Sequence, residues 1–202
     1  MSYSDFTLKS VKNKLGVQII ESQNLFTQIN EIEISQLLRE ILAENVPLAR
    51  AINTEKARSE LIISNILVEV RKMANHKISL FSGIEFNVNQ EQGLNGYCDF
   101  ILSASTEQLT LNAPIITIVE AKNENLVGAL GQCTAEMVAA SIFNEEEHNE
   151  AIKNLYGVVT TGTAWRFLKM AGPKIYIDLD EYSIENHGKI LGILSEMVNQ
   201  KA

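Results

Sequence analysis

The run Ile115-Ile116-Thr117-Ile118-Val119-Glu120-Ala121-Lys122 constrains the fold of this chain more than any other segment. It is apolar on both faces until its last three residues, and segment 97–103 is apolar in the same way. Strands with two apolar faces are typical of a sheet that helices cover on both sides. These two segments therefore predict a central sheet between layers of helices.

Hydrophobic periodicity and turn residues predict the remaining elements. Helices are predicted over 35–44, capped by Ser35 and ended by Asn45-Val46-Pro47, and over 54–74, 126–143 and 184–199. Strands are predicted within 16–26, over 78–89 as a pair or as one strand bent at Gly83, and over 155–160, 164–170 and 175–179. The small residues Gly131, Ala135 and Ala139 predict close contact between helix 126–143 and the sheet. This order predicts an α/β sandwich with a mixed central sheet.

The length of 202 residues suits one domain with a full core. Residues 1–48 are predicted to be an N-terminal extension packed on a domain of residues 49–202. The N-terminus lacks the basic and apolar segments of an export signal, and no apolar run reaches the roughly 18 residues that span a bilayer. Cys98 and Cys133 lie in apolar patterns, which indicates burial rather than a disulfide or a zinc site. We expect a cytoplasmic protein without a membrane partner.

Lys122 is the only Lys or Arg between Lys77 and Lys153. Residues i and i+2 of a strand share a face, so the side chains of Glu120 and Lys122 are predicted to lie side by side, with Ala121 turned to the other face. Asp99 lies on the preceding apolar strand. An acid on one strand and an acid-x-lysine on the next are the arrangement of a magnesium-dependent phosphodiesterase site.

Three further polar residues lie on predicted helices near these strands. Glu60 precedes Ile63 by three positions and Leu67 by seven, which places it on or near the buried stripe of helix 54–74. Gln132 and Glu136 are one helical turn apart on the helix after Lys122, and both can face the site. For Glu136, a structural role is the stronger interpretation and a role in the site is the weaker one.

Phosphodiester hydrolysis needs an attacking water and stabilisation of negative charge, which one or two Mg²⁺ or Mn²⁺ ions supply. Mg²⁺ prefers oxygen ligands and keeps several waters. We therefore assign Asp99, Glu120 and the carbonyl of Ala121 as ligands, and Glu60 to a second ion or a bound water. Lys122 is assigned to orient the attacking water and stabilise charge, because two flanking carboxylates oppose the lowered pKa that a base requires. Gln132 either contacts the phosphate backbone or makes ordinary hydrogen bonds between helix and sheet.

The formal net charge of −8 opposes a nucleic-acid partner, because phosphate neutralisation supplies much of the affinity for DNA. The basic residues are nevertheless clustered before Lys77 and after Lys153, and the middle of the chain is acidic, as a metal-binding centre would be.

The motif of Asp99 followed by Glu120-Ala121-Lys122 resembles that of the PD-(D/E)XK, or restriction-endonuclease-like, nuclease superfamily. The resemblance covers roughly residues 50 to 170 and includes the order of the elements, Glu60 on the first core helix and Gln132 on the helix after the lysine. Cys98 stands where many members have proline, and Glu136 where RecB-like members have tyrosine. The segments 54–60, 81–83 and 160–163 also resemble a group of uncharacterised cyanobacterial proteins of this superfamily. The resemblance implies a restriction-endonuclease-like core and the activity of a metal-dependent DNA endonuclease, which is a hydrolase. Many members of the superfamily work as homodimers, so a homodimer is expected here.

Two other functions stay open on the sequence alone. One is a catalytically silent protein-interaction module that keeps the nuclease fold and uses its acidic surface, which the net charge favours. The other is a phosphodiesterase acting on RNA or nucleotides, since 2′-hydroxyl recognition has no short signature here.

Trp165 and Tyr97 are both expected to pack in the core. A position in a groove stays open for Tyr97, because it shares a strand face with Asp99.

Overall fold

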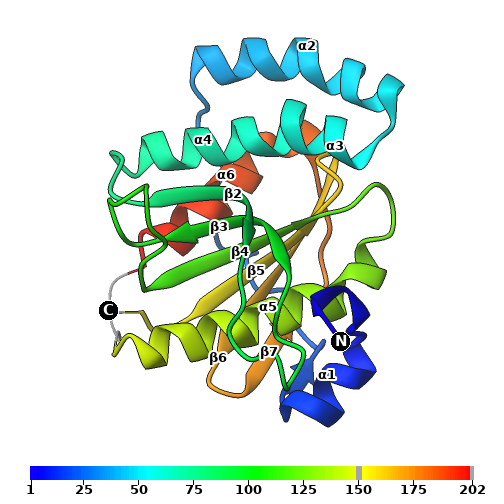
Figure 1. Ribbon diagram of the computed structural model, residues 1–202. Coiled ribbons are helices and arrows are strands. Elements are labelled where there is room, and N and C mark those ends of the chain that lie inside the picture. Colours follow the sequence, from blue (N-terminus) through cyan, green and yellow to red (C-terminus); the bar gives the residue numbers. More distant parts are fainter. Residues whose placement is uncertain (149–151, 201–202) are drawn as a thin grey trace.

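The computed structural model describes residues 1–148 and 152–200 (Figure 1). Within these residues an eight-stranded mixed sheet runs in the order β1-β7-β6-β5-β4-β3-β2, and β8 pairs with β6. The strands are β1 (Gln18–Ile20), β2 (Ser79–Glu85), β3 (Tyr97–Ser103), β4 (Ile115–Ala121), β5 (Leu155–Thr160), β6 (Ala164–Ala171), β7 (Lys174–Ile177) and β8 (Tyr182–Ser183). The predicted α/β sandwich with a mixed sheet is confirmed.

Helix α5 (Leu126–Glu146) covers one face of the sheet because it links two parallel strands. β4 and β5 are parallel neighbours, and such strands require a crossover connection, which α5 supplies. Its buried side chains pack with one core cluster that includes Ile118, Val159 and Leu168. The short helices η1 (Tyr3–Asp5) and α1 (Leu8–Leu15) lie against α5.

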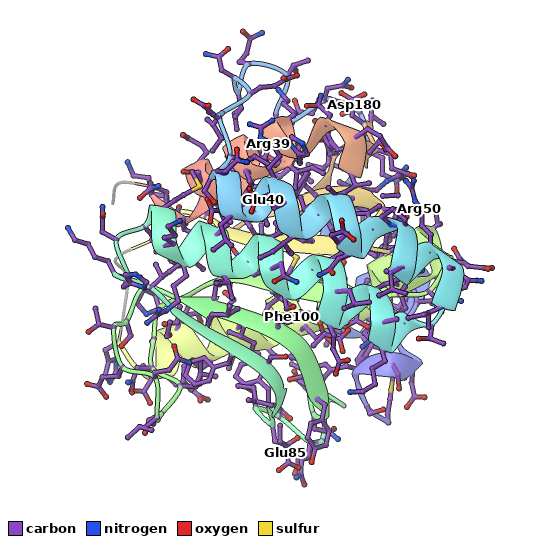
Figure 2. The ribbon with its side chains drawn as sticks, turned by 90° about the horizontal axis from the view of Figure 1, so that it is seen from above. Arg39, Glu40, Arg50, Glu85, Phe100 and Asp180 are labelled. Carbon is purple, nitrogen blue, oxygen red and sulfur yellow. The ribbon has the colours of Figure 1, made fainter. Side chains whose placement is uncertain are left out.

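The other face carries a second core under four helical segments. These are α2 (Gln36–Ile52), α3 (Glu55–Arg58) with the π-helical turn η2 (Ser59–Ile63), α4 (Ser64–Met73), and α6 (His187–Val198), which follows the turn η3 (Ile184–Asn186). The fully buried residues Ile62, Ile66 and Trp165 belong to this core, as expected for Trp165. Figure 2 shows α2 lying alongside the continuous helix from α3 to α4 above the sheet.

The predicted end of the helix at residue 44 is wrong, because α2 continues through Pro47 to Ile52. Its start is as predicted, since the Ser35 hydroxyl accepts a hydrogen bond from the N–H of Leu38. Leu42 before the proline and Ala49 after it are both buried against the helix from α3 to α4, so packing outweighs the local cost of the proline. The proposed boundary between residues 48 and 49 falls inside α2.

The N-terminal segment is part of the packed structure at both ends of the sheet. β1 pairs in parallel with β7 and forms one edge of the sheet. The hydroxyl of Tyr3 donates to the carbonyl of Phe86 at 2.8 Å, which ties the N-terminus to the chain after β2.

The predicted close contact between α5 and the sheet is confirmed, but the part assigned to Gly131 is wrong. A Cβ on Gly131 would lie 2.5 Å from backbone atoms of Phe6 and Thr7, so its missing side chain makes room for the N-terminal segment. Close contact with the sheet depends instead on Gly157 of β5, whose added Cβ would meet the sulfur of Met137 at 2.4 Å.

By length and composition, α5 is the one helix in the described residues that could cross a membrane. No such candidate was expected from the sequence. In the fold, 67% of its apolar window is buried. Its apolar composition is therefore accounted for by its position as a core helix.

We predict that Gly131→Ala lowers the free energy of unfolding by about 1–3 kcal/mol, because the backbone of residues 6 and 7 must move to admit a methyl group. Urea denaturation measures this change. Gly128→Ala on the same helix is the comparison, since the nearest atoms to an added Cβ there belong to the side chain of the helix cap Asn125 and not to backbone. Equal stability of the two variants would contradict the close contact.

Candidate active site

The candidate site lies where the sheet splits between β3 and β4. Their antiparallel register ends at the pair of Phe100 and Val119, whereas β3 remains paired with β2 as far as Tyr97. Past the split, the backbone N–H of Ala121 donates to Oδ2 of Asp99 at 2.7 Å. A carboxylate thus replaces the next backbone partner of β4, and such a hydrogen bond to an ionised acceptor is a strong one.

The hairpin of β2 and β3 consequently projects away from the helices, with Glu85 at its end (Figure 2). Gly83 has φ +62°, a conformation that side chains other than glycine rarely adopt, and it bends β2 opposite the site. The single bent strand is one of the two predicted forms of this segment. Tyr97 on the hairpin is 67% exposed, so the expectation that it packs in the core is wrong.

Glu120 and Lys122 lie side by side, as the strand period predicts. The Nζ of Lys122 is 2.5 Å from Oε1 of Glu120, while Ala121 packs into the core on the opposite face. The Glu120 side chain is 1% exposed and that of Lys122 is 29% exposed. Lys122 therefore covers a buried carboxylate.

Glu136 and Gln132 of α5 lie behind Glu120. The Nε2 of Gln132 donates to Oε1 of Glu136 at 3.0 Å, and the charge of nearby Glu120 acts on the carboxyl group of Glu136. Glu136 is fully buried. Two neighbouring buried carboxyl groups do not readily ionise together, so α5 is coupled to the site through this pair.

Burial, followed by the nearby charge of Asp99, raises the pKa of Glu120 to about 8 against the opposing effect of Lys122. Burial and the charge of Glu120 raise the pKa of Glu136 well above its usual range. Burial alone would lower the pKa of Lys122, but the carboxylates of Glu120, Glu55 and Asp99 outweigh it, and the pKa of Lys122 is raised. Lys122 is therefore a cation at neutral pH.

A cleft of about 260 Å³ opens at the split between β3 and β4. The strands contribute Ser82, Gly83, Asp99 and Ala121 to its wall, and the helix opposite contributes Glu55, Lys56, Ser59 and Glu60. Asp99, Ala121 and Glu60 thus meet at one cleft. Glu120, Lys122 and Gln132 are not among the residues that line it.

The expectation that Glu60 lies on the buried stripe is wrong, because its side chain is 61% exposed and pairs with Lys56 at 2.8 Å. Glu60 is in the π-helical turn, where the extra residue rotates the chain out of the α-helical spacing on which the expectation depended. The hydroxyl of Ser64 and the amide of Asn65 donate to the carbonyl of Glu60 and so satisfy the loosened turn. Such turns are frequent at functional sites.

The donors at the split fit a hard divalent cation in their chemistry. Asp99 and Glu120 offer carboxylate oxygens, and the buried Oε2 of Glu120 has no hydrogen-bond partner among the described residues. In residues 1–148 and 152–200, however, no three His, Cys, Asp or Glu side chains are grouped closely enough to hold a metal. A cation here would therefore take the two carboxylates together with backbone and water oxygens.

A scan of the sequence against protein-family models finds no match, and a search of curated proteins finds none either.

Sequence reasoning placed Asp99, Glu120 and Lys122 on neighbouring strands, and the structure brings these three together. It did not find that Glu120 and Glu136 lie together in the core. For Glu136, a structural role was the stronger interpretation. The one available signal was the position of Glu136 within a helix whose other residues are mostly apolar or small. A carboxylate in such a helix requires a buried partner.

We predict that the protein becomes less stable as the pH rises from about 5 to about 8. Glu120 and Glu136 hold protons in the folded state at pH values where the unfolded chain, with pKa near 4.5, has released them. The unfolded state then binds fewer protons, so the free energy of unfolding falls with pH by up to about 1.4 kcal/mol per unit for each proton that the folded state retains. Chemical denaturation across this range measures the slope.

Glu136→Gln removes one of the two acids and the repulsion on the other, so its stability should depend less steeply on pH. Ser141→Ala, at a partly exposed position on the same helix, should keep the wild-type slope. Parallel curves for the wild type and Glu136→Gln would show that the pKa of Glu136 is not raised in the folded state.

Proposed function

We propose that the protein is a metal-dependent nuclease that hydrolyses phosphodiester bonds in DNA, with a core of the restriction-endonuclease-like type. The main support is the split between β3 and β4, which brings Asp99 to the backbone N–H of Ala121, between Glu120 and Lys122. Asp99 and Ala121 line the cleft, and Glu120 and Lys122 flank Ala121 on the same strand.

Asp99, Glu120 and the carbonyl of Ala121 would hold a Mg²⁺ or Mn²⁺ ion, and Glu60 lines the cleft opposite them. When bound, the ion supplies a nucleophilic water and stabilises negative charge on the phosphate. Ligand carboxylates must be ionised, so Glu120 loses its proton when it binds the ion.

Each of the other side chains has a defined role in this proposal. Lys122 remains a cation and stabilises the charge that develops on the phosphate. Glu136 lies beside Glu120 as a positioning residue, and Gln132 orients Glu136. Gln132 therefore acts as a positioning residue rather than through the phosphate contact that was one of its two expected roles.

The remaining parts of the proposal concern the setting of the reaction. DNA is the proposed substrate, the cytoplasm the proposed location and a homodimer the proposed assembly. Lys56, whose side chain is 82% exposed at the wall of the cleft, supplies positive charge for a backbone phosphate despite the net charge of −8.

Lys122→Ala should abolish cleavage of plasmid, linear, single-stranded and branched DNA in Mg²⁺ or Mn²⁺, with rates reduced by about a hundredfold or more. Lys174→Ala, which removes an exposed lysine from β7, should cleave like the wild type. Circular dichroism checks that both variants fold. Equal cleavage by the wild type and Lys122→Ala would refute the assigned mechanism.

A catalytically silent interaction module is the second candidate. Two ion pairs favour it, because Lys122 neutralises Glu120 and Lys56 neutralises Glu60 within the chain itself. Failure of the wild type to cleave any of these substrates would favour the module.

A further inference from the structure

A second cavity, of about 370 Å³, lies on the other side of the loop that follows Lys122. Its wall contains Asn123, Glu124, Asn125, Leu126 and Val127 from the loop and the start of α5, together with Arg58, Thr161, Thr163, Ala164 and Glu181. Figure 1 shows this loop leaving β4 at the end of the sheet where α3 lies. The cavity is therefore adjacent to the candidate active site but has a different wall.

Arg58 is a buried cation in this wall without an acidic partner. It is 9% exposed, and no carboxylate lies within ion-pair distance of it in residues 1–148 and 152–200. Its NH1 donates to the carbonyl of Thr161 and the hydroxyl of Thr163, both at 3.1 Å, and its NH2 donates to Oδ1 of Asn53 at 3.0 Å. All three acceptors are neutral.

The guanidinium still has hydrogen-bonding capacity. Of its five N–H donors, three make the contacts above, and the buried Nε has no partner among the described residues. Burial of an unpaired charge costs several kcal/mol, which a bound anion would offset.

The first turn of α5 faces the same cavity. The Asn125 side chain accepts from the N–H of Gly128 at 2.9 Å. The N–H groups of Leu126 and Val127, the first two residues of this 21-residue helix, have no partner within it. Free N–H groups and the helix dipole together favour an anion at this end.

Two carboxylates at the rim oppose an anion, and their effect is limited. Glu181 is bound to the guanidinium of Arg166 at 3.2 Å, which compensates its charge. Glu124 is exposed, so solvent screens it.

We propose that this cavity binds a phosphate group between Arg58 and the N-terminus of α5. On the basis of the nuclease function proposed above, the phosphate belongs to the same nucleic-acid strand that enters the cleft. The loop of residues 123–125 connects Lys122 directly to this site, so the two sites hold neighbouring parts of one backbone.

Inorganic phosphate, added in EDTA so that no divalent ion takes part, tests the site itself. We expect phosphate to shift the NMR signals of the Leu126 and Val127 amides and to raise the melting temperature. Lys174→Ala, which removes an exposed lysine outside both sites, should bind phosphate like the wild type. Shifts confined to the cleft between β3 and β4, or no shift at either amide, would overturn the proposal.

Val127→Asp places a carboxylate at the first turn of α5 and should weaken phosphate binding by about tenfold or more. Because an acid at a helix N-terminus is favourable, the variant should fold at least as stably as the wild type without phosphate. Val68→Asp is the matched control, since Val68 is a similarly exposed valine on α4 (57%, against 60% for Val127). Undiminished binding by Val127→Asp would contradict the site.

A short single-stranded DNA oligonucleotide, again in EDTA, identifies the source of the phosphate. Shifts of the same two amides, weakened in Val127→Asp, would support a backbone phosphate. If inorganic phosphate shifts them and the oligonucleotide does not, the assignment to nucleic acid is overturned and a free-phosphate site remains. Neither result decides the nuclease proposal, which the cleavage assay with Lys122→Ala tests separately.

Discussion

The hydrogen bond from the backbone of Ala121 to the carboxylate of Asp99 is the contact on which the candidate site depends. It occurs where β3 and β4 stop pairing, so it satisfies a backbone donor that the ladder would otherwise leave open. The same split frees the hairpin of β2 and β3 from β4 and opens the cleft. One side chain therefore ends the strand pair and lines the proposed site.

The carboxyl pair of Glu120 and Glu136 is costly for the fold. Both side chains are buried, the charge of Glu120 raises the pKa of Glu136, and one oxygen of each lacks a hydrogen-bond partner among the described residues. Lys122 and Gln132 offset part of this cost. Buried polar groups with incomplete partners destabilise a core, and strongly shifted pKa values concentrate at functional sites. The arrangement is better explained by a reaction that uses ionised Glu120 than by stability.

Much of the fold could be predicted because the strands are strongly patterned. Segments 97–103 and 155–160 coincide with β3 and β5, since strands covered on both faces are continuous apolar runs bounded by turns. Local signals were insufficient where tertiary packing decides the outcome. Helix α2 continues past Pro47 because both of its halves are packed. The missing side chain of Gly131 makes room for the N-terminal segment, whose position depends on the folded chain.

The site was predictable in the same measure. The strand period placed Glu120 beside Lys122, because that relation depends only on neighbouring residues in one strand. The exposure of Glu60 depends on a π-helical turn, and the pair of Glu120 with Glu136 depends on how α5 crosses the sheet. Neither has a sequence pattern of its own.

The central claim is that Asp99 and Glu120 together bind a divalent ion, and the Mn²⁺-induced change in melting temperature tests it most directly. The account predicts a rise that is larger at pH 8 than at pH 6, is lost in Asp99→Asn and Glu120→Gln, and persists in the distant control Glu85→Gln. No rise in the wild type, or an equal rise in all four proteins, would contradict it.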